Sequence, residues 1–217
     1  MSKDLLHQPV PDIRLFPTGE VYEVATRFAK TIIGGIEGRA IFDPHDAGIL
    51  AQAVLNAKHG DHVEIGTFYG ASAILVALVK KAFGMHGKVY CVDPLEVRSD
   101  VAPDASTGIM ATQAIVMSNA EKFSVADRIV LVPNYSKPWP IDENKTFASG
   151  YIDGDHWNGF PLWDWQQLSK RVTYSIVFDD YAWGKTEVID AVHVAMQDPN
   201  WICVHISGVQ AVFRRRH

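Results

Sequence analysis

Cysteine is scarce in this chain: among its 217 residues only Cys91 and Cys203 are cysteines. Both lie inside apolar runs, so we expect reduced core residues, not a disulfide or a pair of metal ligands. This usage is typical of a cytoplasmic protein, and the first residues show no secretory signal pattern. A chain of this length buries enough apolar surface to fold without covalent or metal cross-links.

Long apolar stretches and a positive charge are missing too. The longest purely apolar run, residues 73–79, is far shorter than the roughly 20 residues of a membrane span, so we expect no membrane partner. There are 20 Lys and Arg against 25 Asp and Glu, a net charge of −5. Such a chain lacks the surface of a general nucleic-acid binder. The one basic cluster, residues 214–216, is expected to be a solvated strand edge.

Hydrophobic periodicity predicts alternating strands and helices from residue 61 onward. The expected strands are residues 61–65, 88–92, 128–132, 147–152, 174–178, 201–206 and 210–214. The expected helices are residues 21–33, 46–58, 71–83, 107–122, 161–171 and 185–197. The order favours an α/β fold with a Rossmann-like, doubly wound, seven-stranded and mostly parallel sheet. The last two strands form a hairpin, which makes one edge strand antiparallel.

The domain prediction follows from this order. Residues 61–217 form the sheet domain, and residues 1–60 form an N-terminal helical extension, so the chain is effectively one domain. The extension is interpreted as a lid or as a contact in a homo-oligomer.

The turn after the first strand reads EIGTFYGAS, residues 64–72. Its position at the carboxyl end of a first parallel strand is where such sheets bind ligands. Phe68 replaces the second glycine of the dinucleotide fingerprint, which disfavours a diphosphate. A nucleoside carrying an amino acid fits better: Glu64 could face its ammonium group, and Asp93 could accept hydrogen bonds from its ribose. The alternative is that Gly66 and Gly70 are ordinary turn glycines.

Acids end two further strands. Asp153 follows the fourth strand, and Asp179 and Asp180 follow the fifth. Because neighbouring parallel strands present their carboxyl ends to one crevice, we expect the three carboxylates to converge. They would repel each other unless a cation neutralised them, and oxygen ligands suit Mg²⁺ or another hard divalent ion. Alternatively, these acids cap a helix, end a strand or lie in solvent.

These segments resemble a known family. The stretches HVEIGTFYGASA and VYCVDP, with the terminal hairpin, resemble class I S-adenosylmethionine-dependent methyltransferases. YIDGDHW and IVFDDY resemble the metal-binding motifs of the divalent-cation-dependent O-methyltransferases, which include catechol and macrolide-sugar enzymes. The likeness spans residues 61–216 and departs at residues 171–174, where the family usually has a Gly-Gly turn.

The resemblance implies roles for individual residues. Asp153, Asp179 and Asp180 match the metal ligands. The base of this branch lies two or three residues after the first ligand. We favour His156, because imidazole titrates near neutrality, with Asp155 as its orienting partner or substitute. The cofactor-binding positions implied are Glu64, Gly66, Thr67, Tyr69, Gly70, Ser72, Asp93, Ser136 and Asp153.

The implied function is Mg²⁺-dependent transfer of a methyl group from S-adenosylmethionine to a hydroxyl of a small molecule, such as a natural product, sugar or phenol. Two alternatives stay open: another metal-using tailoring enzyme on this scaffold (cephalosporin hydroxylase-like), and a silent cofactor-binding module. Aromatic residues expected around the crevice suit a flat or glycosidic ligand, although Trp163 and Trp165 could equally be core. They are Trp139, Trp157, Trp163, Tyr181 and Trp183.

Overall fold

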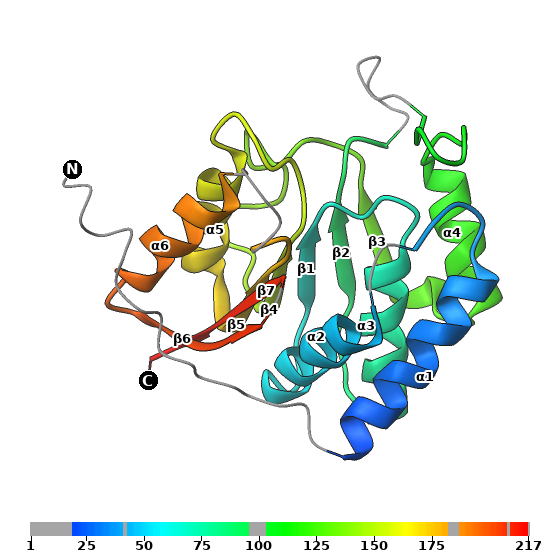
Figure 1. Ribbon diagram of the computed structural model, residues 1–217, viewed down its shortest axis with the longest axis horizontal. Helices are drawn as coiled ribbons and strands as arrows, with labels where there is room; N and C mark the ends of the chain where they lie inside the picture. Colours follow the sequence, from blue (N-terminus) through cyan, green and yellow to red (C-terminus); the bar gives the residue numbers. More distant parts are fainter. Residues whose placement is uncertain (1–18, 41–42, 96–102, 182–186, 208, 217) are drawn as a thin grey trace.

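The protein is described from a computed structural model, which defines residues 19–40, 43–95, 103–181, 187–207 and 209–216. In these residues seven strands form one sheet with the order β3-β2-β1-β4-β5-β7-β6 (Figure 1). All seven lie where the sequence predicts them. The strands are β1 (His62–Ile65), β2 (Val89–Val92), β3 (Ile129–Val132), β4 (Phe147–Ile152), β5 (Val172–Phe178), β6 (Trp201–Ser207) and β7 (Gln210–Arg215).

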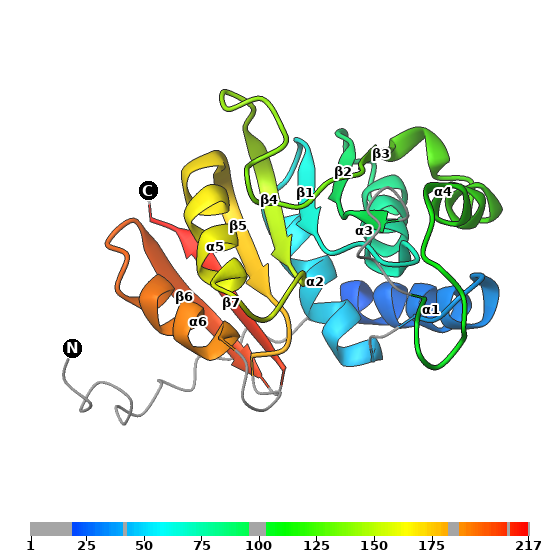
Figure 2. The ribbon, with the colours of Figure 1, turned by 90° about the horizontal axis from the view of Figure 1, so that it is seen from above.

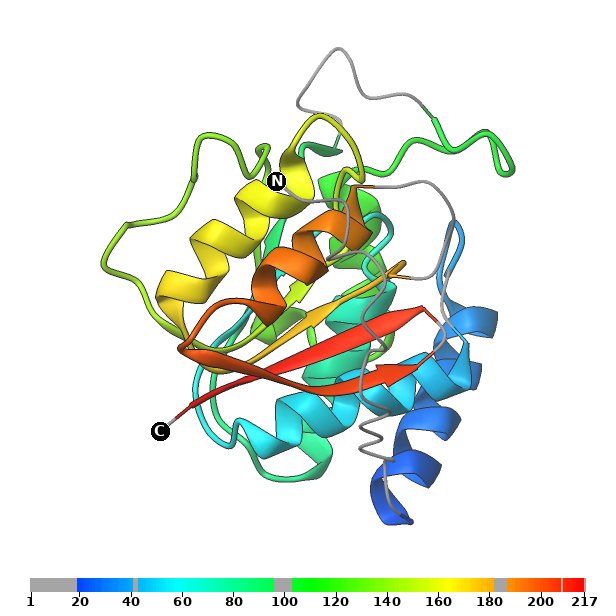
Figure 3. The same ribbon diagram turned by 60° about the vertical axis from the view of Figure 1, so that its left-hand side comes forward.

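The first five strands are parallel and β7 is antiparallel to both of its neighbours. This confirms the mostly parallel Rossmann-like sheet, but the antiparallel strand is not at the edge. β7 lies between β5 and β6, and β6 takes the edge (Figure 3). The reason is apolar burial: the first four residues of β7 are buried, and Phe213 is completely so. Arg214 and Arg216 are exposed, as expected for the basic cluster, but β7 is not an edge strand, and Arg215 donates to the carbonyl of Val172.

Helices cover both faces of the sheet (Figure 2). α1, α2 and α3 pack together on one face, where α2 contacts β4, β5 and β7, while α5 and α6 cover the other face. No helix in the part of the chain that the structure describes is long and apolar enough to cross a bilayer. The helices are α1 (Glu20–Gly35), α2 (Pro44–Asn56), α3 (Ala71–Ala82), α4 (Gln113–Lys122), the short 3-10 helix η3 (Ala126–Arg128), α5 (Phe160–Arg171) and α6 (Val188–Met196).

Local capping explains where two helices begin. The Asp43 carboxylate accepts from the backbone N–H groups of His45 and Asp46, which caps α2 as its sequence suggests. The helix predicted from residue 107 starts only at Gln113. Asp104 instead accepts from the N–H of Thr107 and closes a turn, and the Thr112 hydroxyl caps α4 by accepting from Ile115. These side chains accept hydrogen bonds from backbone N–H groups and so stabilise a non-helical turn. Hydrophobic periodicity does not detect such a turn.

The connection between α5 and β5 has no linker. α5 ends at Arg171 and β5 begins at Val172. This is the place where the Gly-Gly turn expected from the resemblance is missing. β5 therefore begins at Val172, two residues before the predicted strand, whereas it ends at Phe178, as predicted.

Candidate active site

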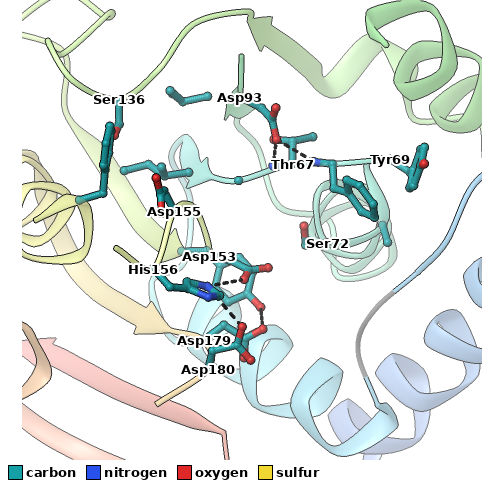
Figure 4. A pocket seen from close by; sticks show the side chains of 18 of the residues that line it. Thr67, Tyr69, Ser72, Asp93, Ser136, Asp153, Asp155, His156, Asp179 and Asp180 are labelled. Atoms are coloured by element: carbon teal, nitrogen blue, oxygen red, sulfur yellow. Dashed lines mark hydrogen bonds and ion pairs between the residues drawn. The ribbon is translucent and has the colours of Figure 1, made fainter. Parts of the chain in front are cut away.

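A cavity of about 970 Å³ opens at the carboxyl ends of the parallel strands (Figure 4). The turns after β1, β2, β3, β4 and β5 line it, as does the segment that leads into α2. A sheet of this topology is expected to bind its ligand at this edge. The cavity has two ends that differ in chemistry: a glycine turn after β1, and a group of acids after β4 and β5.

The glycine turn touches the acid end through its backbone. Gly66 has φ +89°, and a Cβ on it would lie 1.9 Å from the carbonyl oxygen of Asp153. The sequence predicted that Gly66 lets a ligand approach the backbone. The structure shows that the close neighbour is β4 itself, which the N–H of Asp153 joins to β1 by donating to the carbonyl of Ile65 at 2.8 Å.

Asp93 ties this turn to the end of β2. One oxygen of its carboxylate accepts from the N–H groups of Thr67 and Phe68 at 2.7 and 2.8 Å, and the other accepts from Leu95 at 2.9 Å. Phe68 has φ +52°, so these bonds hold a conformation that is costly for a bulky residue. Asp93 also lines the cavity, where its remaining lone pairs can face a ligand.

Glu64 lies below the turn and does not line the cavity. Its side chain is completely buried, and burial raises the pKa of its carboxyl to about 7, a shift that the nearby hydroxyls of Thr67 and Ser72 oppose. The carboxylate expected to face an ammonium group is therefore separated from the cavity by the hydroxyls of Thr67 and Ser72, which do line it.

The start of α3 completes this end of the cavity. Gly70 takes a left-handed conformation at the N-cap, and a Cβ on it would lie 3.0 Å from Val116 of α4, so the glycine allows α3 and α4 to approach closely here. Tyr69 is buried, and its hydroxyl donates to the carbonyl of Ile109, so this ring belongs to the wall. Ser72, in the first turn of α3, faces the cavity (Figure 4).

Ser136 lines the cavity beyond β3 and is almost completely buried. Its backbone carbonyl accepts from the indole of Trp163 at 2.9 Å. A fully buried acid of α5, Asp164, lies behind it. Burial raises the pKa of Asp164 to about 7, and the nearby hydroxyl of Ser136 opposes this shift.

At the acid end, the structure brings together Asp153, His156 and Asp180. One ligand atom from each lies within 4.8 Å of the others. The Nε2 atom of His156 is 3.3 Å from Oδ2 of Asp180 and 3.9 Å from Oδ1 of Asp153 (Figure 4). Asp180 has φ +54°, so the chain turns sharply directly after Asp179.

Asp179 is more deeply placed. Its backbone N–H donates to the carbonyl of Ile152, and its Oδ2 accepts from the hydroxyl of Tyr151 at 2.7 Å. Its other oxygen, Oδ1, is buried and has no hydrogen-bond partner. Burial and the nearby Asp179 raise the pKa of Tyr151 well above its usual value, so the hydroxyl stays protonated and donates.

These groups fit a divalent cation. Burial and the charges of Asp179 and Asp180 raise the pKa of Asp153 well above its ordinary range. Burial also raises the pKa of Asp179 to about 6, although the hydrogen bond from Tyr151 lowers it. Clustered carboxylates with an unpartnered buried oxygen need a positive charge, and carboxylate oxygens are the donors that Mg²⁺ and Mn²⁺ prefer.

The two candidates for the base lie in different environments. Asp155 is exposed, lines the cavity, and accepts from the N–H of Trp157 at 2.9 Å. His156 is partly buried, with its Nε2 atom fully enclosed and directed at the acids. The carboxylate of Asp155 is thus engaged with its own loop, through the N–H of Trp157, and not with the ring of His156.

A comparison with known families decides the identity. The sequence profile of a family described as a methyltransferase domain matches residues 63–181, more than half of the chain. The match includes the Gly66 turn, Asp93 and the acid end. The chain belongs to this methyltransferase family. Its sequence matches no curated protein.

Solved structures agree with the fold of a methyltransferase. The O-methyltransferase NovP has a TM-score of 0.69 and 18% identity, with 91% of this chain and 97% of that chain covered. TomG from Streptomyces achromogenes, in complex with S-adenosylmethionine, has a TM-score of 0.57 and 13% identity, with 94% of this chain and 92% of that chain covered. An O-methyltransferase from Bacillus cereus, in complex with S-adenosylhomocysteine, has a TM-score of 0.55 and 14% identity, with 93% of each chain covered.

Sequence reasoning missed two parts of the methyltransferase site. The sequence patterns assign no role in the site to Asp43 and Asp46, but both line the cavity. Burial and the charges of Asp43, Asp179 and Asp180 raise the pKa of Asp46 to about 7. Tyr151 was taken as an ordinary strand residue. The signal for it was present: Tyr151 stands two residues before Asp153, so both side chains point to one face.

The expected aromatic lining is wrong. Tryptophans do not line the cavity in the described residues, where its aromatic side chains are Phe68, Tyr69, Tyr135, Tyr151 and Phe160. Trp139 and Tyr181 instead pack against the core on the α5 face. The Trp163 indole donates to the carbonyl of Ser136, and Trp157 is exposed. Trp183 lies outside the described residues, as do residues 1–18 of the expected extension.

Proposed function

We propose that this methyltransferase moves a methyl group from S-adenosylmethionine to a hydroxyl oxygen of a small molecule, with the help of a divalent cation such as Mg²⁺. One observation carries the proposal: a glycine turn and an acid cluster share one cavity and meet at Gly66 and Asp153. The structures of TomG, bound to S-adenosylmethionine, and of the Bacillus cereus enzyme, bound to S-adenosylhomocysteine, support it.

The methyl donor would occupy the glycine end. Its sulfonium makes the methyl group electrophilic, so the protein's task is to position it. The first turn of α3 offers N–H groups to its carboxylate, and Asp93 offers acceptor oxygens to its ribose. Ser136 would face the base, and the acid of Glu64 below the turn would balance the ammonium charge.

The cation would be held by Asp153, Asp179 and Asp180. When bound, it lowers the pKa of the acceptor hydroxyl and orients it. The three acids come from the ends of β4 and β5, whose register is fixed by the sheet, so their spacing depends little on ligands. Asp46 adds negative charge from the α2 side.

His156 would accept the proton of the acceptor hydroxyl at Nε2. This atom is enclosed, lacks a hydrogen-bond partner and lies at the acid cluster, where the acceptor would be oriented. A neutral imidazole accepts a proton readily near neutral pH. Asp155, exposed in the same cavity, would be the substitute acceptor.

The N-terminal extension would shape the acceptor end. Arg39, Asp43 and Asp46 line the cavity, and Arg39 forms an ion pair with Asp104 at 2.8 Å. This places part of the extension as a wall over the site, which supports the lid interpretation. A non-haem iron oxygenase would need two histidines and one carboxylate, whereas His156 is the one histidine beside the acids in the cluster of possible metal ligands among the described residues.

Calorimetric titration of S-adenosylmethionine, with and without Mg²⁺, tests the proposal. Wild type should bind the donor, and it should methylate members of a panel of hydroxylated compounds only when the cation is present. Asp179→Ala should lose the cation dependence and most of the turnover. Asp190→Ala, an exposed acid on α6, is the matched control.

Other results would overturn specific parts. Binding of NADH without binding of S-adenosylmethionine would refute the assignment of the glycine turn. Donor binding without methylation of any compound, with or without cation, would favour a silent module. Methylation that is unaffected by removing divalent cations would remove the cation from the mechanism.

A further inference from the structure

Tyr151 and Asp179 form a buried pair on the floor of the acid cluster. Tyr151 lies on β4 opposite Val177 of β5, and its ring belongs to the core beneath α2. Its hydroxyl donates to Oδ2 of Asp179 at 2.7 Å, and the two residues are 2% and 8% exposed. A strand held on both sides by the sheet gives this tyrosine little freedom to move.

This pairing leaves the carboxylate of Asp179 with two unequal oxygens. Oδ2 is engaged by a donor, whereas Oδ1 is buried and has no partner. Both Asp179 and the neighbouring Asp153 line the cavity. The orphan oxygen is therefore the atom of Asp179 that is available to a ligand of the acid cluster.

The number of oxygens that a carboxylate offers matters for the choice of cation. Mg²⁺ demands nearly octahedral geometry at about 2.0–2.1 Å and takes one oxygen from each carboxylate. Ca²⁺ accepts six to eight oxygens at about 2.3–2.6 Å and often takes both oxygens of one carboxylate. A cation bound to both oxygens of Asp179 would have to compete with the Tyr151 hydroxyl for Oδ2.

We propose that Tyr151 is a positioning residue that restricts Asp179 to a single oxygen contact and thereby selects a small octahedral cation over a larger one. The inference rests on the proposed cation site and adds to it a residue that decides which ion is held. Tyr151 acts through Asp179 and does not itself contact the ion.

Tyr151→Phe removes the hydroxyl and keeps the ring, and calorimetric titration with Mg²⁺, Mn²⁺ and Ca²⁺ measures the result. Loss of a group that orients a metal ligand typically costs about 10- to 100-fold in metal affinity. We expect Mg²⁺ affinity to fall by about this factor, and Ca²⁺ affinity to fall less or to rise. The ratio of Ca²⁺ to Mg²⁺ affinity should therefore increase, by about 10-fold or more if Ca²⁺ affinity does not fall.

Tyr90→Phe is the matched control, since Tyr90 is a half-buried tyrosine of β2 outside the cavity lining. Its affinity ratio should equal that of wild type. Tyr151→Met provides a second variant without the hydroxyl if the phenylalanine variant does not fold. In an Asp179→Asn background, Tyr151→Phe should change the ratio no further, because its effect passes through that carboxylate.

The outcomes separate the inference from the proposed function. If wild type binds none of the three ions, the proposed cation site is wrong and the inference falls with it. If wild type binds Mg²⁺ and Tyr151→Phe leaves the affinity ratio unchanged, only the role of Tyr151 is refuted. An equal loss of Mg²⁺ and Ca²⁺ affinity also refutes it, because that pattern reports a general disturbance of the site.

Discussion

Gly66 and Asp153 are in backbone contact: the carbonyl oxygen of Asp153 fills the space that a side chain on Gly66 would need. One residue thus serves both ends of the cavity, because Asp153 touches the glycine turn with its carbonyl and joins the acid cluster with its carboxylate. The distance between the two ends is set by this contact and by the pairing of β1 with β4.

Gly66→Ala tests this contact. The added methyl group would lie 1.9 Å from the Asp153 oxygen in a backbone with φ +89°, so the turn or β4 must move. We expect a loss of about 2–4 kcal/mol in the free energy of unfolding, and at least 10-fold weaker binding of the methyl donor and of the cation. Urea denaturation and calorimetry measure these quantities.

Gly84→Ala is the control, since Gly84 has φ +63° but open space around its Cβ position. It should cost only the backbone strain of about 1–2 kcal/mol and leave both affinities unchanged. Normal cation affinity in Gly66→Ala would show that the two ends are independent.

The doubly wound sheet and the acid cluster were predictable because both depend on local patterns. Short apolar strands between helices define a doubly wound sheet, and acids placed directly after β4 and β5 must meet at one edge. The interior position of β7 was not predictable, since it depends on which strand of the hairpin pairs with β5. Nor was the role of Asp46, whose proximity to Asp179 requires the packing of α2 on the sheet.

His156, at the acid cluster, should contribute strongly to the rate of methyl transfer. His156→Ala should reduce turnover by about 100-fold or more, because it removes the proposed proton acceptor, whereas Asp155→Asn should reduce it less. The rate of methyl transfer at saturating donor and cation is the measurement. His193→Ala on α6 controls for loss of an imidazole outside the cavity lining. Unchanged turnover in His156→Ala, with a large loss in Asp155→Asn, would transfer the role to Asp155.

The acid contributed by α2 should tune cation affinity from a distance. Asp46→Asn removes a charge that interacts with Asp179 and Asp180, so Mg²⁺ binding should weaken by about 3- to 10-fold. The effect should shrink as ionic strength rises, because this carboxylate is only partly buried. Asp190→Asn, an exposed acid on α6, should change nothing. Complete loss of binding in Asp46→Asn would instead indicate a direct ligand.

The buried acid of α5 should make stability depend on pH. Burial raises the pKa of Asp164 from 3.8 to about 7, so the folded state holds this proton more tightly than the unfolded state. The free energy of unfolding should therefore fall between about pH 4 and pH 7. Asp164→Asn lacks this loss and should be more stable than wild type by roughly 2–4 kcal/mol above pH 7.

Urea denaturation at pH 4, 6 and 8 checks this prediction. The difference between Asp164→Asn and wild type should become small at pH 4, where the carboxyl is protonated in the folded state and about half protonated in the unfolded state. A difference of the same size at every pH would mean that the substitution acts through packing and not through ionisation. Asp190→Asn should give a small difference without a trend in pH.

The direct passage from α5 into β5 determines where this scaffold is able to diversify. A connection of zero residues has no length to vary, so an insertion or deletion at Arg171 and Val172 would slide β5 along its neighbours and turn Asp179 to the other face. The exposed residues 157–159 are under no such restriction, because they form a loop between His156 and the start of α5. Evolution toward new acceptors is therefore freer to change these residues than the opposite end of α5.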